Sequence, residues 1–580
     1  MANLSQIKRQ RMLDFLNELK REHTDDDKIL RAIGEIENEL NAKKYGLVWE
    51  QHEEAVDVKM KDYIPVFTED HDREIAAAPG EGYNFLLEGD NLHSLKLLEK
   101  THKGKIDVIY IDPPYNTGNK DDFCYDDHYI ASEDTFRHSK WLSFMSERLE
   151  IIKKLMSQSG LIFINIGEQE LASLKMLCDE IFGEINYVTI FTRQMKSGGA
   201  KGKYYTPSTD YILAYASDIR YLPNFRAIMT QKQIAVFYKY VEKDGTRAGE
   251  IYGEERLFKA SLEARPNQRY YIECPDGSFV IPPGNSFPDS VKDGAKVTPN
   301  KSDKVWKWIY KRYKAEKANG NIIFKKTKTS PLIDEHGNKS KWNIYNKLWL
   351  SEQQTKGVVP ANLITDYENR QSAKEIKKLG ITFTYAKPIK LIKYLLTISN
   401  QCKNATVLDC FAGSGTTAQA VLELNQEDDG NRHFILCTNN ENSICENVTY
   451  PRVKTVITGI RPDGSKYSDG IPANLKYYKT DFVARKEEYL SDALLKHIAE
   501  MIQLENGIKL DRKKYLMILT DEQADEISSH GDQYPDVKAI YLSKNVLLTT
   551  DQEALFENIP VYIIPDYYFD FELREEGESW

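Results

Sequence analysis

A short apolar run that ends in two prolines constrains the fold of this chain most. Residues 106–111 read Ile-Asp-Val-Ile-Tyr-Ile and are followed by Asp112, Pro113, Pro114 and Tyr115. A β-branched run of this length predicts a buried parallel strand, and the prolines end it because they fix φ and lack an N–H. Ligands of open α/β sheets bind just beyond the C-terminal ends of strands. The sequence therefore predicts a rigid ligand-binding strand end.

The same four residues suit a planar base that carries an exocyclic amine. The Asp112 carboxylate and the Pro113 carbonyl can each accept one N–H bond, and Pro114 has no N–H to hold that carbonyl in a turn. The Tyr115 ring can stack on a base taken out of a duplex. A tetrapeptide of this kind can equally be an ordinary strand end and turn. Its functional interpretation therefore depends on a second motif.

Strands and helices alternate on both sides of this motif. This alternation predicts an α/β fold with a doubly wound, mostly parallel sheet. The expected strands cover residues 83–88, 160–166, 187–191, 211–215, 405–409 and 432–437, and the expected helices cover residues 92–100, 141–156, 171–182, 388–399, 418–424, 450–457 and 487–504.

A glycine-rich turn supplies the second motif. Residues 410–417 read Cys-Phe-Ala-Gly-Ser-Gly-Thr-Thr after the strand at 405–409. Glycines there let the backbone approach a ligand, and no Lys follows, so the turn is not a P-loop. Glu441 follows the next strand and can accept ribose hydroxyls, although alone it would be an ordinary surface acid. Asp409 can meet an ammonium group, and the set therefore favours S-adenosylmethionine over a dinucleotide.

Together the two motifs describe methyl transfer to an aromatic amine. The lone pair of such an amine is delocalised into the ring, which makes the nitrogen a poor nucleophile. Hydrogen bonds to Asp112 and to the Pro113 carbonyl draw the nitrogen towards tetrahedral geometry and stabilise the positive charge that develops on it. The chemistry needs neither a covalent nucleophile nor a metal, and we expect no metal site.

A basic segment lies between the two motifs. Residues 296–347 contain 14 Lys or Arg and four Asp or Glu, a balance of +10 in a chain whose net charge is −10. Trp and Tyr residues interleave with these charges. Such runs are often solvated surfaces, but this imbalance favours a nucleic-acid surface. A glycine-rich basic loop at 193–203 is predicted to contact phosphate or to be a plain solvated loop.

Composition limits the remaining possibilities. The chain has 580 residues, of which 41% are hydrophobic and 29% charged, which indicates several globular domains. The negative net charge excludes a uniformly basic nucleic-acid binder. No apolar stretch reaches the length of a membrane span, and the N-terminus has no signal-peptide core. Seven cysteines without a CxxC pair fit a reducing cytoplasm.

Changes of character along the chain predict five segments. The first is expected to be a helical hairpin that either packs on the core or docks a second subunit or partner. The last is acidic and is expected to be a small α/β domain that binds a partner. The segments are a helical N-terminal element (1–60), a first core part (61–219), a middle segment of short mixed elements (220–375), a second core part (376–481) and a C-terminal domain (482–580).

The motifs resemble those of amino-methyltransferases of DNA in the β group, in which the motif order is permuted. Residues 87–92 (Leu-Glu-Gly-Asp-Asn-Leu) and 109–118, together with Lys387-Pro388 before residues 409–417, resemble the Mod subunit of Type III restriction-modification systems. Residues 470–481 strengthen the resemblance, which covers roughly residues 80–215 and 380–485. The resemblance implies the methyltransferase fold with permuted motifs and an inserted DNA-recognition domain, the target-recognition domain, at residues 220–375.

The resemblance also assigns roles to individual residues. It implies that Asp112, Pro113, Pro114 and Tyr115 handle a flipped adenine. It implies a cofactor site in which Asp90 lies near the adenine, Glu441 on the ribose, and Thr384 and Lys387 near the methionine end. The remaining residues implied to line the cofactor are Asp409, Phe411, Gly413, Gly415 and Thr416.

The implied activity is S-adenosylmethionine-dependent methylation of adenine N6 in double-stranded DNA. The family further implies a Mod homodimer and a separate ATP-driven Res helicase-nuclease. Three alternatives remain open. They are cytosine-N4 methylation, which more often has Ser in the position of Asp112; an orphan methyltransferase without a nuclease partner; and a specificity subunit that mainly positions Res on DNA.

Overall fold

The structure is a computed structural model that describes residues 4–23, 26–41, 49–118, 124–125, 128–129, 134–198, 204–529 and 536–578. It divides into two compact units. One combines Met1–Asn224 with Ala361–Trp580, and the other is Phe225–Pro360. The second unit lies inside the segment 220–375, for which a target-recognition role stays a prediction.

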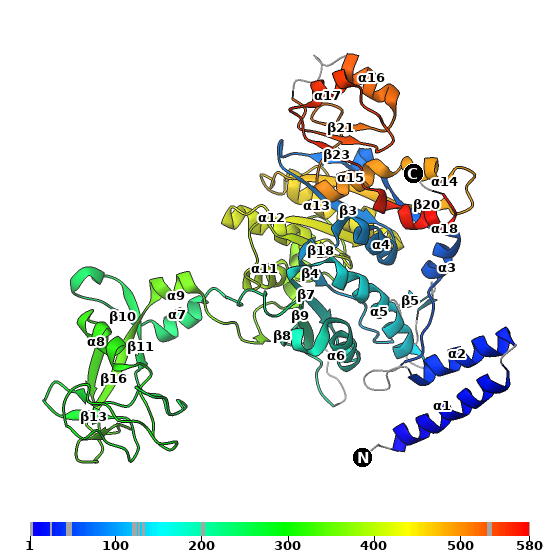
Figure 1. Ribbon diagram of the computed structural model, residues 1–580. Coiled ribbons are helices and arrows are strands. Elements are labelled where there is room, and N and C mark those ends of the chain that lie inside the picture. Colours follow the sequence, from blue (N-terminus) through cyan, green and yellow to red (C-terminus); the bar gives the residue numbers. More distant parts are fainter. Residues whose placement is uncertain are drawn as a thin grey trace. The chain divides into compact units, whose positions relative to one another are not determined.

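An eleven-stranded sheet forms the centre of the first unit (Figure 1). Its order is β1-β20-β3-β19-β18-β4-β7-β9-β8-β17, with β2 paired to β20. The strands are β1 Tyr63–Glu69, β2 Ile75–Ala76, β3 Tyr83–Glu88, β4 Ile106–Ile111, β7 Met156–Ile166, β8 Tyr187–Gln194, β9 Thr209–Ala216, β17 Leu363–Ile364, β18 Thr406–Asp409, β19 His433–Thr438 and β20 Asn474–Ala484.

The sheet is mostly parallel, as the sequence predicts. Every pairing from β20 through β3, β19, β18 and β4 to β7 is parallel. Antiparallel pairs occur only towards the edges among the described strands, where β1 and β2 pair with β20, and β9 lies between β7 and β8. The predicted doubly wound α/β class is confirmed.

The two sequence motifs meet because the halves of the chain interleave in this sheet. Strands β18 and β19, from the second half, lie between β3 and β4. Val407 pairs with Val108 and Leu408 with Ile109. Since these strands are parallel, their C-terminal ends reach the same edge of the sheet, and Asp112 and Asp409 follow neighbouring strands.

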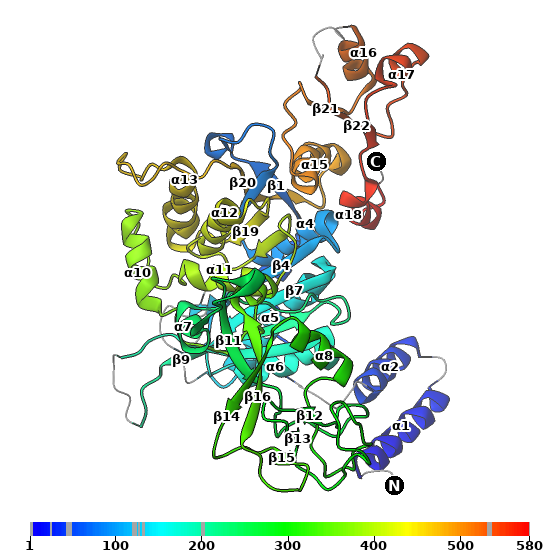
Figure 2. The ribbon, with the colours of Figure 1, turned by 90° about the vertical axis from the view of Figure 1, so that its left-hand side faces the viewer.

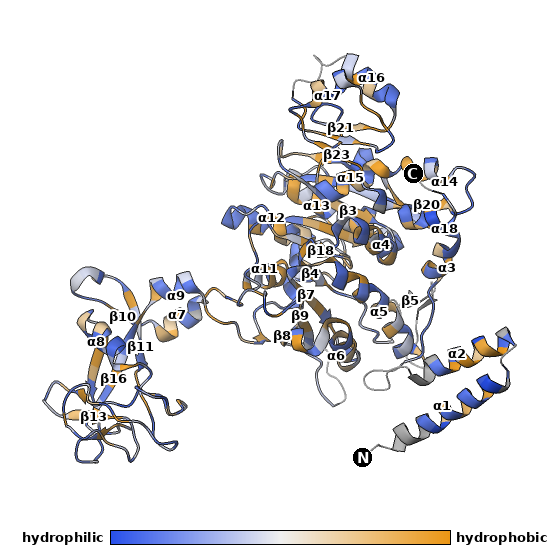
Figure 3. Cartoon of the chain, in the orientation of Figure 1, coloured by the Kyte–Doolittle hydropathy of each residue, from blue (hydrophilic) through white to orange (hydrophobic). Residues whose placement is uncertain are grey.

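Helices cover both faces of the sheet (Figure 1). On one face α4, α5 and α6 share an apolar core with strand residues such as Leu87, Ile109 and Ile164. On the other side, α11 packs against α12, and α12 packs against α13. Figure 3 shows the apolar strands between the two helical layers. The helices of the core are α3 Ala55–Asp62, α4 Asn91–His102, α5 Arg137–Leu155, α6 Leu171–Cys178, α10 Asn369–Lys378, α11 Ile389–Ile398, α12 Thr416–Asp428 and α13 Tyr450–Thr458. A short hairpin of β5 Cys124–Tyr125 and β6 His128–Tyr129 stands apart from the sheet.

The second unit has two small antiparallel sheets, β10-β11-β16-β14 and β12-β13-β15 (Figure 2). Its core is aromatic, and Trp306 and Tyr313 are fully buried in it. The aromatic residues that interleave with the lysines were interpreted as part of a nucleic-acid surface, but these two rings pack the interior of the unit. Its elements are α7 Gln231–Phe237, β10 Tyr240–Val241, β11 Ile251–Arg256, β12 Ile272–Glu273, β13 Phe279–Ile281, α8 Tyr310–Ala318, β14 Ile322–Lys326, β15 Ile333–Asp334, β16 Trp342–Trp349 and α9 Leu350–Lys356.

The first residues form a helical hairpin of α1 Leu4–Glu22 and α2 Asp27–Asn41. The Lys20 ammonium donates to the Glu37 carboxylate at 2.5 Å across the hairpin. Leu16 and Ile33 are buried, whereas Phe15 is 59% exposed. Both proposed roles of the hairpin, packing on the core and docking a partner, stay predictions.

The expected helix over 487–504 is wrong, because the chain there forms two helices, α14 Leu490–Leu495 and α15 Ile498–Asn506. His497 lies at the break, and its ring Nδ1 contacts the Phe67 carbonyl at 3.0 Å. Beyond these helices, β21 Tyr515–Ile518, β22 Ala539–Leu542 and β23 Val561–Ile563 form a small parallel sheet, with α16 Asp521–Ser529, α17 Thr550–Phe556 and α18 Asp570–Glu575. Across the described ranges, no helix combines the length and the apolar character needed to cross a bilayer.

Candidate functional site

The Asp112 carboxylate lies between a cation and an amide. Lys387 donates its ammonium to Oδ2, and the Asn165 amide donates to Oδ1 at 3.3 Å. The Asp112 side chain keeps 22% of its surface exposed. Lys387 comes from the loop before α11, and its Nζ lies 5.1 Å from the centroid of the Tyr115 ring. The structure thus brings Asp112, Tyr115 and Lys387 together.

A buried ion pair supports this group from behind. Arg193 on β8 donates Nε to the Asp210 carboxylate on β9 at 2.7 Å, and both side chains are almost fully buried. The Tyr115 hydroxyl donates to Asp210 at 3.4 Å and also contacts the Asn165 amide. Burial, and then the charge of Asp112, raise the pKa of Tyr115 well above its usual range. Tyr115 therefore stays a neutral ring and a hydrogen-bond donor.

These contacts revise the prediction for the basic loop at 193–203. Arg193 was predicted to belong to a solvated or phosphate-binding loop. It is instead the second-last residue of β8, and its guanidinium forms an ion pair with the Asp210 carboxylate. Its remaining Nη atoms donate to the Tyr367 carbonyl at 2.9 Å and to Asn369 Oδ1 at 3.0 Å. Residues 199–203 lie outside the described residues.

The backbone after the prolines is held by residues that sequence reasoning missed. Trp141 on α5 donates its indole N–H to the Pro114 carbonyl at 2.8 Å. Asn116 is fully buried with φ +56°, and its amide donates to Glu170 Oε1 at 2.5 Å. An Asn directly after a turn is a local signal for such a left-handed conformation. The partner Glu170 lies far along the chain and gives no signal.

The glycine-rich turn joins β18 to α12. Gly413 and Gly415 have φ of +48° and +71°, a region that residues with a Cβ rarely adopt. A Cβ on Gly415 would also lie 3.1 Å from the Thr449 side chain. The turn therefore requires glycine at both positions. Because no helical turn precedes α12, the backbone N–H groups at its start have no acceptor within the helix.

Asp409 is buried beneath this turn. Its carboxylate accepts bonds from the Thr417 hydroxyl and from the Phe411 backbone N–H, the latter at 3.1 Å. Burial is the main cause that raises the pKa of Asp409 to about 7. Both oxygens thus have partners within the turn. Contact with the ammonium of a ligand stays a prediction.

Thr416 ties the turn to Lys387. Its hydroxyl donates to the Lys387 carbonyl at 3.3 Å and accepts from Arg452 Nη1 at 2.8 Å. The side chain of Thr416 is buried, so it acts first as a link between the two segments. Thr384 is exposed on the loop that leads into Lys387. The Phe411 ring is partly buried and lies 5.9 Å, centroid to centroid, from the Phe144 ring on α5.

Asp90 and Glu441 follow the next two strand ends along the edge. Strands β3 and β19 are neighbours there, since the Gly89 N–H donates to the Thr438 carbonyl at 3.0 Å. Asp90 caps α4 by accepting from the Leu92 N–H at 2.8 Å. Glu441 is exposed and accepts from the Asn439 amide at 3.3 Å. Both acids lie at the sheet edge where a ligand is expected.

A buried arginine links the end of β3 to the glycine turn, and no local pattern in the sequence indicates this role. Arg148 on α5 donates Nε to Asn91 at 2.6 Å and Nη1 to the Glu54 carboxylate at 2.6 Å. Asn91 in turn donates to the Cys410 carbonyl at 3.1 Å. Helix α5 therefore fixes the start of α4 and the start of the glycine turn together.

The donor set fits a nucleoside that carries an amino acid. Glu441 offers an exposed carboxylate for ribose hydroxyls, Phe411 offers a ring, and Lys387 offers a cation for a carboxylate. The free N–H groups at the start of α12 favour negative charge. These groups fit S-adenosylmethionine, although its contacts with the individual residues stay a prediction.

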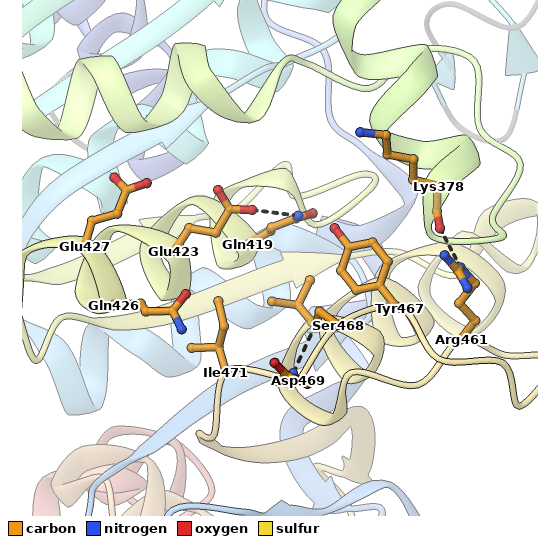
Figure 4. Close-up of a pocket in the computed structure, with 12 residues that line it drawn as sticks. Lys378, Gln419, Glu423, Gln426, Glu427, Arg461, Tyr467, Ser468, Asp469 and Ile471 are labelled. Carbon is orange, nitrogen blue, oxygen red and sulfur yellow. Dashed lines mark hydrogen bonds between the residues drawn. The ribbon is translucent and has the colours of Figure 1, made fainter.

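A separate cavity of about 740 Å³ lies along the flank of α12 (Figure 4). Its lining mixes acids such as Glu423 and Asp469 with the cations Lys378 and Arg461. Gln419 donates to Glu423 at 2.9 Å inside it. None of the predicted site residues lines this cavity.

The fold and the strand-end geometry together define a doubly wound α/β protein with a composite site at one sheet edge. More particularly, the chain belongs to the DNA methylase family, whose sequence profile matches residues 106–449. That match covers both motifs and the second unit. It supports the resemblance based on the two motifs and their order.

Curated relatives include Mod subunits. The chain is 28% identical to the EcoPI Mod subunit of Escherichia phage P1 over 462 residues, 72% of this chain and 66% of that protein. It is 29% identical to the StyLTI Mod subunit of Salmonella typhimurium, covering 65% of this chain and 55% of the relative. It is 30% identical to the Type II methyltransferase M.KpnI of Klebsiella pneumoniae, covering 68% and 90%. The matches thus span between half and two thirds of the Mod subunits.

Proposed function

We propose that this protein transfers a methyl group from S-adenosylmethionine to N6 of a flipped adenine in DNA. We propose further that it is the modification and specificity subunit of a Type III restriction-modification system. One observation carries the proposal. The Asp112 strand end and the glycine turn, 297 residues apart when counted from Asp112 to Asp409, follow neighbouring parallel strands.

The chain's own groups have distinct tasks in this reaction. Asp112 accepts one N–H of the target amine, and the Pro113 carbonyl is assigned the other. The two bonds free the nitrogen lone pair and stabilise its developing positive charge. Tyr115 presents a neutral ring to the base, because its raised pKa keeps the hydroxyl protonated. When bound, the cofactor supplies the activated methyl group.

Lysines in the second unit are proposed to bind the DNA backbone. Lys326 is the last residue of β14, and the Thr327 N–H donates to the Lys341 carbonyl at 2.8 Å, so Lys326 and Lys341 lie at the two ends of one connecting segment. Lys328 and Lys339 belong to this segment. All four side chains are exposed, and none has an ion-pair partner within the described ranges. By contrast, Lys325 on the same strand is paired with Glu254.

Replacing Lys326, Lys328, Lys339 and Lys341 by Gln is expected to weaken DNA binding roughly tenfold or more, and to reduce the slope of log K against log salt by up to about 3–4. A matched variant, Lys513→Gln with Lys514→Gln, removes exposed charge from the C-terminal part instead and is expected to leave binding unchanged. Fluorescence anisotropy over a salt series measures both. An unchanged slope in the fourfold variant would contradict the assignment.

Single-molecule sequencing of DNA from cells that express the chain tests the reaction itself. The proposal expects N6-methyladenine in one sequence context, and none in cells that express Asp112→Ala. N4-methylcytosine, or no mark at all, would refute the adenine assignment. Since the substrate is DNA, the proposed place of action is the cytoplasm.

A second candidate is a methyltransferase that works without a nuclease. The similarity to M.KpnI, a Type II methyltransferase, over 90% of that protein favours it. The two candidates differ in partners, because the first requires a Res helicase-nuclease and a Mod homodimer. Mass spectrometry of the intact complex purified from its own host decides between them.

A further inference from the structure

The acceptor carboxylate is already occupied by a cation. The Lys387 ammonium donates to Asp112 Oδ2, and the Asn165 amide donates to Asp112 Oδ1. Both charged side chains are largely shielded, with 11% of Lys387 and 22% of Asp112 exposed. Shielding strengthens the attraction between them. Asp112 is therefore neutralised in the position where the target amine is expected.

This ion pair opposes the proposed chemistry. The methyl transfer places positive charge on the amine nitrogen, and a carboxylate stabilises that charge best when it has no other cation. An ammonium at the same oxygen would repel both the sulfonium and the developing charge. Lys387 must therefore have a different anionic partner when the site is loaded.

The neighbouring acid cannot be that partner. Asp409 is 3% exposed, and its carboxylate already accepts from the Thr417 hydroxyl and the Phe411 N–H. Among the described residues, Asp112 is the one acid within 4.0 Å of the Lys387 ammonium, so we expect a second anionic partner to come from a ligand. The anionic group of an amino-acid-bearing nucleoside is its carboxylate.

The backbone of Lys387 is fixed in a place from which its side chain can reach either anion. Its carbonyl accepts from Thr416, the first residue of α12, at 3.3 Å, and Pro388 follows directly. Thr416 comes immediately after the glycine turn. Lys387 thus lies between the strand end of Asp112 and the turn that is expected to bind the cofactor, while its four-carbon stem remains able to change rotamer.

We propose that Lys387 exchanges its partner, from Asp112, which it contacts in the structure, to the carboxylate of the cofactor's methionine end, so that cofactor binding releases Asp112 for the target amine. This inference rests on the proposed function. The cofactor then binds before the base, and its carboxylate is what couples the two sites. Such coupling is reciprocal, so a change at Asp112 alters cofactor affinity.

Two nucleosides isolate the amino-acid end of the cofactor, which carries this carboxylate, in a binding experiment. S-Adenosylhomocysteine and 5′-methylthioadenosine both have a neutral thioether, and only the first carries the amino acid. Calorimetry on the full chain compares both ligands with wild type, Asp112→Asn, Lys387→Met and the double variant. No DNA and no turnover are needed.

The exchange predicts a specific pattern. Asp112→Asn leaves Lys387 without its competing anion, so S-adenosylhomocysteine binds about five- to tenfold tighter. Lys387→Met weakens that ligand by tenfold or more, and adding Asp112→Asn to it has no further effect. Methylthioadenosine binds equally to all four proteins. Lys387→Arg keeps the cation and retains the preference for S-adenosylhomocysteine.

Other outcomes overturn the exchange. If Asp112→Asn leaves S-adenosylhomocysteine affinity unchanged or lower, or if it tightens both nucleosides equally, Lys387 does not move between the two anions. If Lys387→Met does not fold, the comparison of wild type with Asp112→Asn for both nucleosides still tests the exchange. If the wild-type protein methylates adenine but Asp112→Asn does not change the affinity for S-adenosylhomocysteine, only the exchange is refuted. If the wild-type protein binds neither nucleoside and does not methylate DNA, the proposed function is refuted.

Discussion

Asp112 and Asp409 follow neighbouring parallel strands at the same sheet edge, yet their surroundings differ. Asp112, just after β4, keeps 22% of its side chain exposed and contacts a lysine from a distant loop. Asp409, the last residue of β18, is 3% exposed and accepts bonds from residues two and eight positions further along its own turn.

Asp112 is thus partly exposed at the position where a ligand is expected, whereas both described partners of Asp409 lie within its own turn. A partner such as Lys387, which is long and flexible, can leave Asp112 at little conformational cost. The partners of Asp409 are a backbone N–H and a buried hydroxyl, which cannot leave without breaking the turn. The residue type at a strand end therefore does not define its task, and the mobility of its partner does.

The largest expected effect is that of Asp112→Ala. Methyl transfer to DNA is expected to fall by roughly 10²–10³-fold, because one of the two amine acceptors is lost. The melting temperature is expected to stay within a few degrees of wild type, since the side chain is partly exposed. Transfer of tritiated methyl groups and calorimetry with S-adenosylhomocysteine measure the two properties. Loss of nucleoside binding in this variant would remove the distinction between the two aspartates.

Asp409→Asn is expected to change stability and its pH dependence. Burial raises the pKa of Asp409 to about 7, above its usual value near 4 in an unfolded chain. The folded state then binds the extra proton, so the stability linked to this group is present below about pH 4 and is lost as the pH rises towards 7. Asn cannot titrate. The free energy of unfolding of wild type relative to this variant should therefore fall between pH 4 and 7.

Urea denaturation at several pH values measures that difference. Asp112→Asn serves as the matched control, because it replaces the same residue type at the neighbouring strand end. A difference between wild type and Asp409→Asn that does not vary with pH would show that Asp409 ionises in the folded state as freely as in water.

Much of the fold is readable from the sequence because its strands are local apolar runs. Strands β3 and β4 occupy the predicted residues 83–88 and 106–111, since glycine or proline bounds each run. The order of strands is not readable. Nothing in residues 405–437 indicates that β18 and β19 insert between β3 and β4, because pairing between distant segments leaves no periodic pattern.

The same limit applies to the site. Asp112 and the glycine turn have signatures within a few residues, and they could be predicted as a pair. Arg193 was assigned to a loop that is solvated or contacts phosphate, because its partner Asp210 is 17 residues away on another strand. The tryptophans of the second unit alternate with lysines in sequence. Only the packing shows that Trp306 points inward.

Asn165→Ala is expected to have an intermediate effect. Asn165 is the second-last residue of β7, is fully buried, and donates to Asp112 at 3.3 Å and Asp210 at 3.4 Å. Its loss lets the Asp112 carboxylate rotate, so methyl transfer should slow about tenfold, equivalent to roughly 1.4 kcal/mol. Thr417→Val, which removes the corresponding support of Asp409, should reduce stability instead. Single-turnover kinetics and urea midpoints on both variants test whether the two supports separate in this way.

Glu441→Gln is expected to have the smallest effect and extends the comparison to a third strand end. Glu441 is exposed, so water already screens its charge, and its described partner is the Asn439 amide at 3.3 Å. Removing the charge should weaken nucleoside binding about three- to tenfold, because a charged acceptor on the ribose is replaced by a neutral one. Stability should not change. Methylthioadenosine and S-adenosylhomocysteine carry the same ribose, so calorimetry should show the same loss for both ligands. A loss confined to S-adenosylhomocysteine would instead place Glu441 at the amino-acid end, and the order of the strand ends along the cofactor would have to be reversed.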